Sequence, residues 1–445
     1  MTRNKRRILF YLFTLIFVLI TVSALFYSNG WRFDWETITI NQLGGIYFAK
    51  IPDGATLTID KVDLSFNPNF FRSSIVIANL FPKTYTAHVV KDGYQSWTKE
   101  INVEPALVTE VTPVVLLPQQ PDLSAPVAEK ISDFWTGPGN TLITLKNGKL
   151  SFGTHTLPGS SVVAWSTDGS AVLTEQKNTY YLVHLNNSTS ALNVTLLFAN
   201  LQKTLPAARR ADIRSIRFQP GSATALIART SGGLYQVDTK ALALVTISGS
   251  PVRAFDVSPN EVLYATATSS LMSYSFGTQQ ETAVAASTTP ADITALTFND
   301  SGDFFTAQNG AGKLVLVNRQ TLAGFVVAQN ARTALFAPKQ MKLAFTTANQ
   351  ELVIYTYGKN DDLLDTPKTE VLRISGEDEQ LLAWDQSGSH LFMQYPDALY
   401  LLEGDNMPPI NLQSVADHVQ KYLYDTSSGT LSFLRANSLY QTVIQ

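Results

Sequence analysis

The sequence predicts an all-β protein with one N-terminal transmembrane helix, a small β-sandwich and a seven- or eight-bladed β-propeller. Charged residues make up only 16% of the 445 residues, against about 25% in ordinary soluble domains. Thr, Ser, Val, Leu and aromatic residues, which favour strands, take their place. One uncharged apolar run lies near the N-terminus. In the long C-terminal part a strand–turn–strand pattern recurs with a period of about 40 residues, which is typical of a propeller.

The composition excludes several classes of function. The net charge is −3, so the chain has no general basic field of the kind that holds nucleic acid. The chain contains no cysteine, which rules out disulfides, thiolate zinc sites, iron–sulfur clusters and cysteine nucleophiles. We therefore expect no nucleic-acid partner and no thiol chemistry.

Residues 8–27 form the uncharged run. It has 27 − 8 + 1 = 20 residues, and at about 1.5 Å per residue a helix of this length covers roughly 30 Å, the thickness of the hydrocarbon core of a bilayer. Four basic residues lie in the preceding tail, residues 1–7, and one, Arg32, follows soon after the run. This asymmetry predicts that the tail is cytoplasmic and that the bulk of the chain lies outside the cytoplasm.

Two other interpretations of the run remain open, a cleaved signal peptide and a buried core helix. Val22-Ser23-Ala24 is a tolerable cleavage site, but the apolar run continues beyond it, which favours an uncleaved anchor. Tyr27, Trp31 and Trp35 lie at or beside the linker 28–42 and suit the far membrane interface, where amphipathic rings collect. We expect a single-pass protein of the cell membrane that contacts the lipid bilayer through residues 8–27.

Residues 43–118 alternate in polarity over several short runs, which predicts a small β-sandwich. Leu57 and Ile59 fall on one face of an alternating strand. The preceding Pro-Asp-Gly-Ala segment predicts a turn, because Pro presets φ and Gly supplies a positive φ.

This region resembles the PEGA domain, a family named for a Pro-Glu-Gly-Ala turn. The residues that carry the resemblance, each with an expected turn or core role, are Pro52, Asp53, Gly54, Ala55, Gly93, Tyr94 and Trp97. The sequence departs from the family pattern where Asp53 replaces Glu and where Lys83 replaces a turn Gly. The resemblance implies a bacterial envelope or surface protein in which this domain is a spacer or contacts the wall or surface. It supplies no catalytic residues.

The pattern of residues 119–445 predicts the propeller. Each repeat has an apolar or aromatic strand end, a polar turn and a second apolar strand, and the eight strand ends lie at residues 135, 165, 218, 257, 298, 336, 384 and 424. Their mean spacing is (424 − 135)/7, about 41 residues, near the period of a four-stranded blade. One gap is only 165 − 135 = 30 residues, so the blade count stays between seven and eight.

The turn is clearest in two repeats, at Trp165, Asp168 and Gly169 and again at Trp384 and Gly388. Asp bonds its own backbone and Gly takes a positive φ, so we interpret these residues as structural, with the aromatic rings packed between blades. The repeats resemble WD40-like and Tol-B-like propellers in this turn, although they lack the Gly-His and Trp-Asp pairs of WD40 repeats. The resemblance implies an interaction platform with loops on two faces.

The last repeat is one strand short, because only three predicted strands precede the end of the given sequence. An open propeller would leave edge strands unpaired, which natural β-proteins avoid. We therefore predict that Leu123–Ala128 pairs beside Leu439–Ile444 and closes the ring.

No catalytic motif is evident. The sequence contains no His-Glu-x-x-His, no Gly-x-Ser-x-Gly and no complete phosphate-binding loop, and its five histidines are not at metal-ligand spacing. We therefore assign no catalytic, cofactor-binding or metal-binding residue, and we leave the residues of the binding surface unassigned.

The leading hypothesis is a non-catalytic envelope protein whose propeller binds a protein or a cell-wall or surface glycan. Two alternatives remain, a propeller enzyme that acts on envelope glycans and a purely structural spacer. Two or more acidic residues in a deep axial pocket would favour the enzyme.

Overall fold

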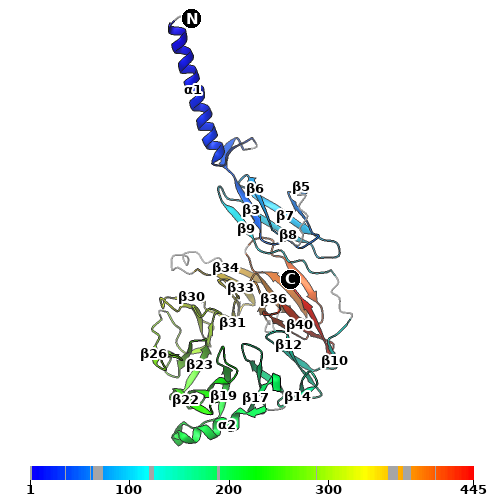
Figure 1. Ribbon diagram of the computed structural model, residues 1–445, viewed down its shortest axis with the longest axis vertical. Coiled ribbons are helices and arrows are strands. Elements are labelled where there is room, and N and C mark those ends of the chain that lie inside the picture. Colours follow the sequence, from blue (N-terminus) through cyan, green and yellow to red (C-terminus); the bar gives the residue numbers. More distant parts are fainter. Residues whose placement is uncertain are drawn as a thin grey trace. The chain divides into compact units, whose positions relative to one another are not determined.

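The computed structural model describes residues 3–35, 37–60, 62–63, 74–119, 125–187, 191–286, 288–358, 369–373, 382–405 and 407–444. The chain divides into two compact units (Figure 1). The first contains Met1–Pro121 together with Asp405–Gln413, and the second contains Asp122–Gly404 and Ser414–Gln445. The sequence assigns residues 405–413 to the propeller, yet they are part of the first unit.

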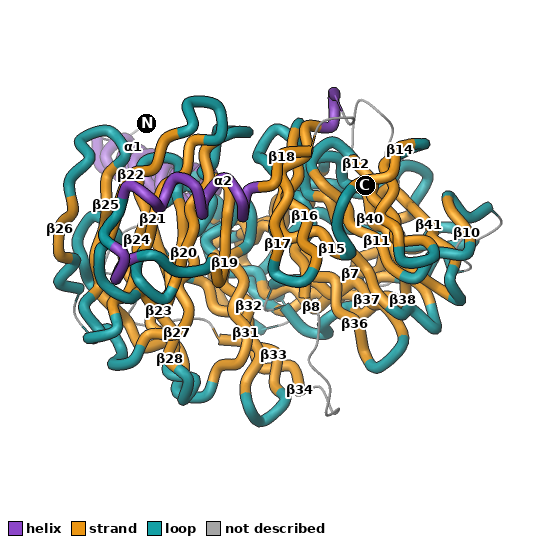
Figure 2. Tube along the Cα trace, turned by 90° about the horizontal axis from the view of Figure 1, so that it is seen from below, coloured by secondary structure: helices purple, strands orange, loops and turns teal. Residues whose placement is uncertain are grey.

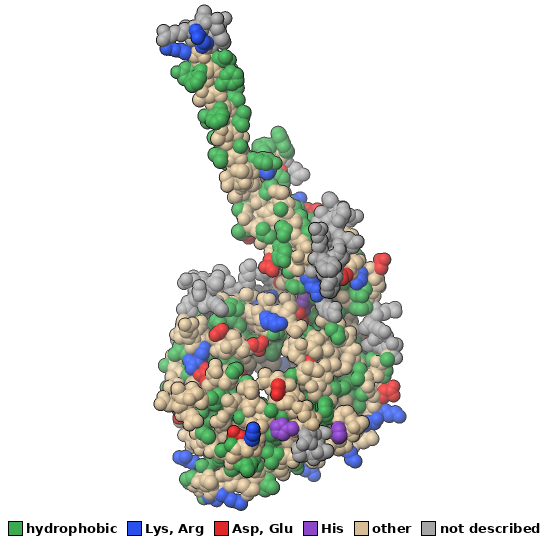
Figure 3. All heavy atoms as spheres, in the orientation of Figure 1, with side chains coloured by type: hydrophobic (Ala, Val, Ile, Leu, Met, Phe, Trp, Pro, Cys, Tyr) green, Lys and Arg blue, Asp and Glu red, His purple; other side chains and the backbone are tan. Residues whose placement is uncertain are grey.

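The first unit begins with helix α1, Arg3–Ser28. Within it, Arg6–Ser28 is long enough to cross a membrane and has a mean hydropathy of 2.6; it is the one such helix in the described part of the chain, and none of its side chains is buried in the protein. Figure 3 shows apolar side chains along this helix and Lys and Arg side chains at its amino-terminal end. A helix of this length and composition could serve as a single-pass anchor or as a signal sequence.

A two-stranded hairpin follows the helix, with β1 at Trp31–Asp34 and β2 at Thr39–Gln42. In this register Phe33 lies opposite Ile40, and Arg32 lies opposite Asn41. Because successive side chains of a strand point to opposite faces, one face of the hairpin is mainly apolar and the other is polar.

The remaining strands of the first unit form a sandwich of two sheets. One sheet has the order β6-β3-β9 and the other β5-β4-β7-β8. The strands are β3 Gly44–Phe48, β4 Thr56–Ile59, β5 Val62–Asp63, β6 Ile75–Leu80, β7 Thr84–Val90, β8 Trp97–Asn102 and β9 Val108–Val111. Leu57 and Ile59 are both buried in the core, which confirms the face predicted for them.

The second unit consists of four-stranded antiparallel sheets, of which the described residues show eight. The first four are β11 Asp133–Gly137, β12 Thr141–Lys146, β13 Lys149–Phe152 and β14 His155–Leu157; β15 Ser161–Trp165, β16 Ala171–Gln176, β17 Thr179–His184 and β18 Ala191–Asn193; β19 Ile213–Phe218, β20 Ala225–Thr230, β21 Leu234–Asp238 and β22 Ala243–Ser248; and β23 Val252–Val257, β24 Glu261–Thr266, β25 Leu271–Ser275 and β26 Glu281–Ala283.

The remaining sheets continue the order along the chain. They are β27 Ile293–Phe298, β28 Phe304–Asn309, β29 Leu314–Asn318 and β30 Gly324–Ala328; β31 Ala331–Phe336, β32 Lys342–Thr347, β33 Glu351–Thr356 and β34 Thr369–Arg373; β35 Leu382–Trp384, β36 His390–Tyr395, β37 Ala398–Glu403 and β38 Leu412–Ala416; and β10 Ala128–Glu129 with β39 Lys421–Asp425, β40 Thr430–Arg435 and β41 Ser438–Val443.

These sheets form a β-propeller. First strands of successive sheets contact each other, as β15 contacts β19 and β23 contacts β27, and β11 of the first sheet contacts β39 of the last. The eight strand ends predicted from the sequence lie at or near the ends of these first strands.

The closing strand is β10. Ala128 pairs with Leu439 and Glu129 with Ser438, and the Val127 N–H donates to the Leu439 carbonyl at 2.7 Å. The predicted closure is therefore confirmed at Ala128, and it extends one residue further than predicted. Residues 123 and 124 lie outside the described residues.

Two features were not anticipated, the β1–β2 hairpin within the predicted linker 28–42 and helix α2. Helix α2, Val194–Leu201, lies beside β17 and β22 (Figure 2), in the longest interval between predicted repeats. Asn193 caps it by accepting the Leu196 N–H at 2.8 Å, and Val194 and Phe198 are buried. The 3₁₀ turns η1 Leu185–Asn187, η2 Gln202–Thr204 and η3 Ala207–Arg209 flank this region.

Candidate functional site

The candidate site is a hollow in the propeller. A register shift between the first two strands occurs in five successive sheets, those that begin with β15, β19, β23, β27 and β31, and three of them line the hollow. The pairing of β19 with β20 skips Arg214, that of β23 with β24 skips Arg253, and that of β27 with β28 skips Thr294. Each skipped residue is the extra residue of a β-bulge, which leaves the ladder and turns its side chain in a new direction. The bulges therefore place two arginines and one threonine at equivalent positions of three successive sheets.

These three residues line one hollow of about 390 Å³. Its full lining is Arg214, Arg229, Thr230, Ser231, Pro251, Val252, Arg253 and Thr294. The lining contains three guanidinium groups and three hydroxyl groups but no carboxylate. Its volume falls within the usual range of small-ligand sites, about 300–1,000 Å³.

Arg229 is the most constrained of the three arginines. Its Nε donates to the Ser215 Oγ at 3.0 Å, and its Nη1 donates to the Arg253 carbonyl. Burial and then the positive charges of Arg214 and Arg217 lower the pKa of Arg229. An anion beside this guanidinium would relieve that repulsion.

Neighbouring carboxylates compensate only some of the positive charge. Arg253 pairs with Asp292, whose side chain is 70% exposed, and Arg217 pairs with Asp256. Within the described ranges neither Arg214 nor Arg229 has a carboxylate within ion-pair distance.

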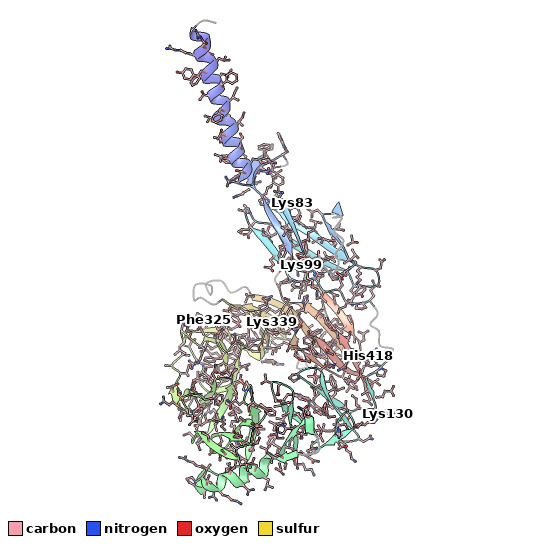
Figure 4. All side chains as sticks on the ribbon, in the orientation of Figure 1. Lys83, Lys99, Lys130, Phe325, Lys339 and His418 are labelled. Carbon is pink, nitrogen blue, oxygen red and sulfur yellow. The ribbon has the colours of Figure 1, made fainter. Side chains whose placement is uncertain are left out.

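A second hollow, of about 570 Å³, lies at the ring closure. It is lined by Glu129, Lys130, Ile131, Ser132, Asn147, Gly148, Ala436, Asn437 and Ser438, and Figure 4 labels Lys130 just after β10. Positive and negative side chains are both present, so this hollow has no single charge preference. Among the described residues no group of three or more His, Cys, Asp or Glu side chains is arranged to hold a metal ion.

The motif residues of the first unit lie in turns and in the core. The Ala55 N–H donates to the Pro52 carbonyl at 3.2 Å, and Gly54 between them has a φ of +73°, with Asp53 in the same turn. Gly93 has a φ of +77° in the turn where the Tyr94 N–H donates to the Lys91 carbonyl.

Trp97, at the start of β8, is fully buried and packs edge-to-face on Phe48. This residue therefore occupies the centre of the sandwich core rather than a surface.

The motif residues of the propeller lie at contacts between neighbouring sheets. The Trp165 ring lies against Gly137 of the preceding sheet so closely that any added Cβ would overlap it. The Trp384 Nε1 donates to the Leu335 carbonyl of the preceding sheet at 3.1 Å.

The turn residues Gly169 and Gly388 face the carbonyls of Pro138 and Pro338 at positive φ, where a side chain would clash. Asp168 accepts from the Ser166 hydroxyl at 2.7 Å and from the Ser170 N–H at 3.1 Å.

None of the motif residues therefore lines the hollow that contains Arg214, Arg229 and Arg253, which we call the arginine hollow. The hollow was missed because its residues do not form a local motif. The one sequence signal for this hollow is the spacing of Arg214, Arg253 and Thr294. The intervals are 253 − 214 = 39 and 294 − 253 = 41 residues, which matches the period of the blades.

Comparison with known proteins adds little to this picture. No protein-family model and no curated protein sequence matches the chain. Among solved structures, the C-terminal WD40 domain of Sif2 is similar at 15% identity, with a TM-score of 0.47, over 72% of this chain and 98% of that one.

Two further structures are similar at the same level. The β-propeller domain of Cps50 (Swd1) from Myceliophteria thermophila shares 11% identity over 72% of this chain and 98% of that one, with a TM-score of 0.41. The dihydro-heme d1 dehydrogenase NirN in complex with DHE shares 12% identity over 71% of this chain and 73% of that one, with a TM-score of 0.47. At these scores the similarities carry no argument, and the propeller assignment depends on the sheet order and contacts described above.

Proposed function

We propose that this protein is a membrane-anchored, non-catalytic binding protein of a bacterial cell envelope, and that its propeller presents the binding surface outside the cytoplasm. The observation that carries the proposal is the combination of an apolar helix that is not buried in the protein and a ring of sheets with a cationic hollow. We count each of the eight four-stranded sheets as a blade, which makes the propeller eight-bladed.

The anchor is supported by the helix and by the hairpin that follows it. Arg6–Ser28 is long enough to span a bilayer, and basic residues precede it. Trp35 and Ile38, at the hairpin tip, are 84% and 78% exposed, which suits a position among lipid headgroups. The N-terminus is cytoplasmic in this proposal.

The sandwich is proposed to be a PEGA-like spacer or surface-contacting domain. The proposal is supported by turns at Pro52–Ala55 and at Gly93, each with a glycine at positive φ. Every motif residue described above lies in a turn or in the core, which agrees with a structural role for the domain and offers no reactive group.

The binding role is favoured over an enzyme by the chemistry of the hollows. An acid–base mechanism on glycans uses two carboxylates, whereas the lining of the arginine hollow contains no carboxylate and that of the closure hollow contains one, Glu129. Positively charged and hydroxyl groups suit recognition of an anionic protein or glycan.

Two experiments test the proposal. Protease added to intact spheroplasts should degrade the propeller, and a fully protected propeller would show that the topology is wrong. Affinity capture with the purified full-length chain, from solubilised membranes and cell-wall fractions, should return a reproducible protein or glycan. Repeated capture of nothing above a denatured control would favour a purely structural spacer.

A further inference from the structure

We propose that the hollow formed by the bulges of β19, β23 and β27 is a phosphate-binding site. In this site Arg214, Arg229 and Arg253 bind the oxygens of a phosphoryl group. The inference deepens the proposed function, on which it rests, by naming the chemical group that the propeller recognises.

The first argument is charge. Three guanidinium groups line the hollow, and Asp292 compensates one of them through Arg253, which leaves 3 − 1 = 2 positive charges. A phosphate monoester carries about −1.5 to −2 at pH 7 and a carboxylate only −1. A phosphoryl group therefore matches the uncompensated charge better than a carboxylate does.

The second argument is the arrangement of donors. Guanidinium groups offer paired N–H donors that fit phosphate oxygens. Ser231 adds a hydroxyl to the lining, whereas the Thr230 and Thr294 hydroxyls already donate to the Gly233 and Gln308 carbonyls. Arg229 is already held by Ser215 and by the Arg253 carbonyl, so little side-chain freedom is lost when an anion binds. Arg229 is thus preorganised for an anion.

The third argument is that the arrangement is costly without a ligand. Burial first, and then the positive charges of Arg214 and Arg217, lower the pKa of Arg229, so its charged form is disfavoured unless an anion lies beside it.

The test uses the full-length chain in a phosphate-free detergent such as dodecyl maltoside, titrated with inorganic phosphate in a calorimeter at pH 7. We expect saturable binding in the millimolar range that weakens as salt is added, because salt screens the guanidinium charges. Glucose 6-phosphate and glucuronate are compared in parallel. If glucose 6-phosphate binds more tightly than inorganic phosphate, the site recognises a phosphoryl group on a larger molecule. If the two bind equally, the site recognises free phosphate.

Two variants and one matched control accompany the titration. Arg214→Gln and Arg229→Gln should each weaken phosphate binding about tenfold, the loss expected for one charge-assisted hydrogen bond. Arg332→Gln is the control, because Arg332 is an exposed arginine that also lies in a bulge, in β31, but does not line the hollow. Arg214 is exposed, so its variant remains informative if Arg229→Gln lowers the melting temperature.

Three results would overturn the inference. They are the absence of saturable phosphate binding, equal loss in Arg332→Gln, and preference for glucuronate over both phosphates. The proposed function fails separately. If the wild type bound phosphate saturably but repeatedly captured no partner, the phosphate site would stand and the proposed partner-binding role would be wrong.

Discussion

The Lys99 ammonium and the Asp405 carboxylate form a buried ion pair at 2.7 Å, although 306 residues (405 − 99) separate them in the sequence. Both belong to the first unit, and their side chains are 0% and 7% exposed. The Thr112 hydroxyl donates to the same carboxylate at 2.8 Å. Figure 4 labels Lys99 on β8.

The ion pair is one part of a longer contact along β8, the edge strand of its sheet. The Glu100 N–H donates to the Pro408 carbonyl, and Asn411 bonds both the N–H and the carbonyl of Thr98. Residues 405–413 therefore cover an edge that would otherwise expose unpaired backbone groups.

Breaking this ion pair should destabilise the first unit. Asp405→Asn leaves the buried Lys99 charge without its carboxylate, which costs about 3–5 kcal/mol for a buried pair. Hydrogen exchange of peptides from β7 and β8, measured by mass spectrometry, should become faster.

The control for this change is Asp397→Asn, since Asp397 is an exposed partner of His418 and its loss should cost less than about 0.5 kcal/mol. The double variant Lys99→Met, Asp405→Leu removes both charges and should recover most of the protection. Unchanged exchange in Asp405→Asn would show that residues 405–413 are not required by the sandwich.

The ring closure should depend on one backbone donor. Val127→Pro removes the N–H that bonds the Leu439 carbonyl, and leaving that carbonyl unsatisfied should cost about 1–3 kcal/mol. Val127→Ala keeps the N–H donor. Because the Val127 side chain is 53% exposed, shortening it should reduce the free energy of unfolding only slightly. Differential scanning calorimetry should therefore show a lower melting temperature for the Pro variant only.

Deleting residues 122–128 also removes Ala128 and should lower the melting temperature further. Equal melting temperatures for the deletion, the Pro variant and the wild type would contradict closure by β10.

Acid should weaken the propeller partly through Asp168. Hydrogen bonds from the Ser166 hydroxyl and from Ser170 lower the pKa of Asp168 from 3.8 to about 2. Because the folded pKa is lower than the unfolded one, this carboxylate contributes stability above pH 4 that is lost as the pH falls toward 2. The melting temperature of Asp168→Asn should be below that of the wild type at pH 6, and the difference should shrink by pH 2.

A second variant isolates the cause of this shift. Ser166→Ala removes the main donor to Asp168 and should move the acid transition to higher pH. A difference between Asp168→Asn and the wild type that stays constant from pH 6 to pH 2 would exclude Asp168 as a source of the acid dependence.

The hairpin after α1 should lie in the membrane interface. Bromine on lipid acyl chains quenches tryptophan fluorescence at short range, and Trp35 is 84% exposed at the hairpin tip. In nanodiscs with lipids brominated near the headgroup, the quenched fraction should fall in Trp35→Phe. It should not fall in Trp384→Phe, since Trp384 is buried in the propeller. Equal quenching in Trp35→Phe and the wild type would place the hairpin in water.

Much of the fold could be predicted because its signals are local. Alternation of polar and apolar residues with a period of two indicates the strands, and polar turn motifs indicate the connections between them. All eight first strands could therefore be located from residues such as Trp165 and Trp384. Helix α2 was missed because its signal is only a cap at Asn193 and eight mainly apolar residues, too short to separate from a buried strand by periodicity.

The sequence by itself determined the apolar helix, the strand pattern and the need for a closing strand, because hydropathy, alternation and turn chemistry are properties of neighbouring residues. Only the tertiary structure decided which edge residues 405–413 would cover and which side chains the bulges would bring together. Pairing over long separations depends on backbone edges left open by the rest of the fold. The placement of Arg214 and Arg253 depends on one extra residue in each strand, which alternation alone does not reveal.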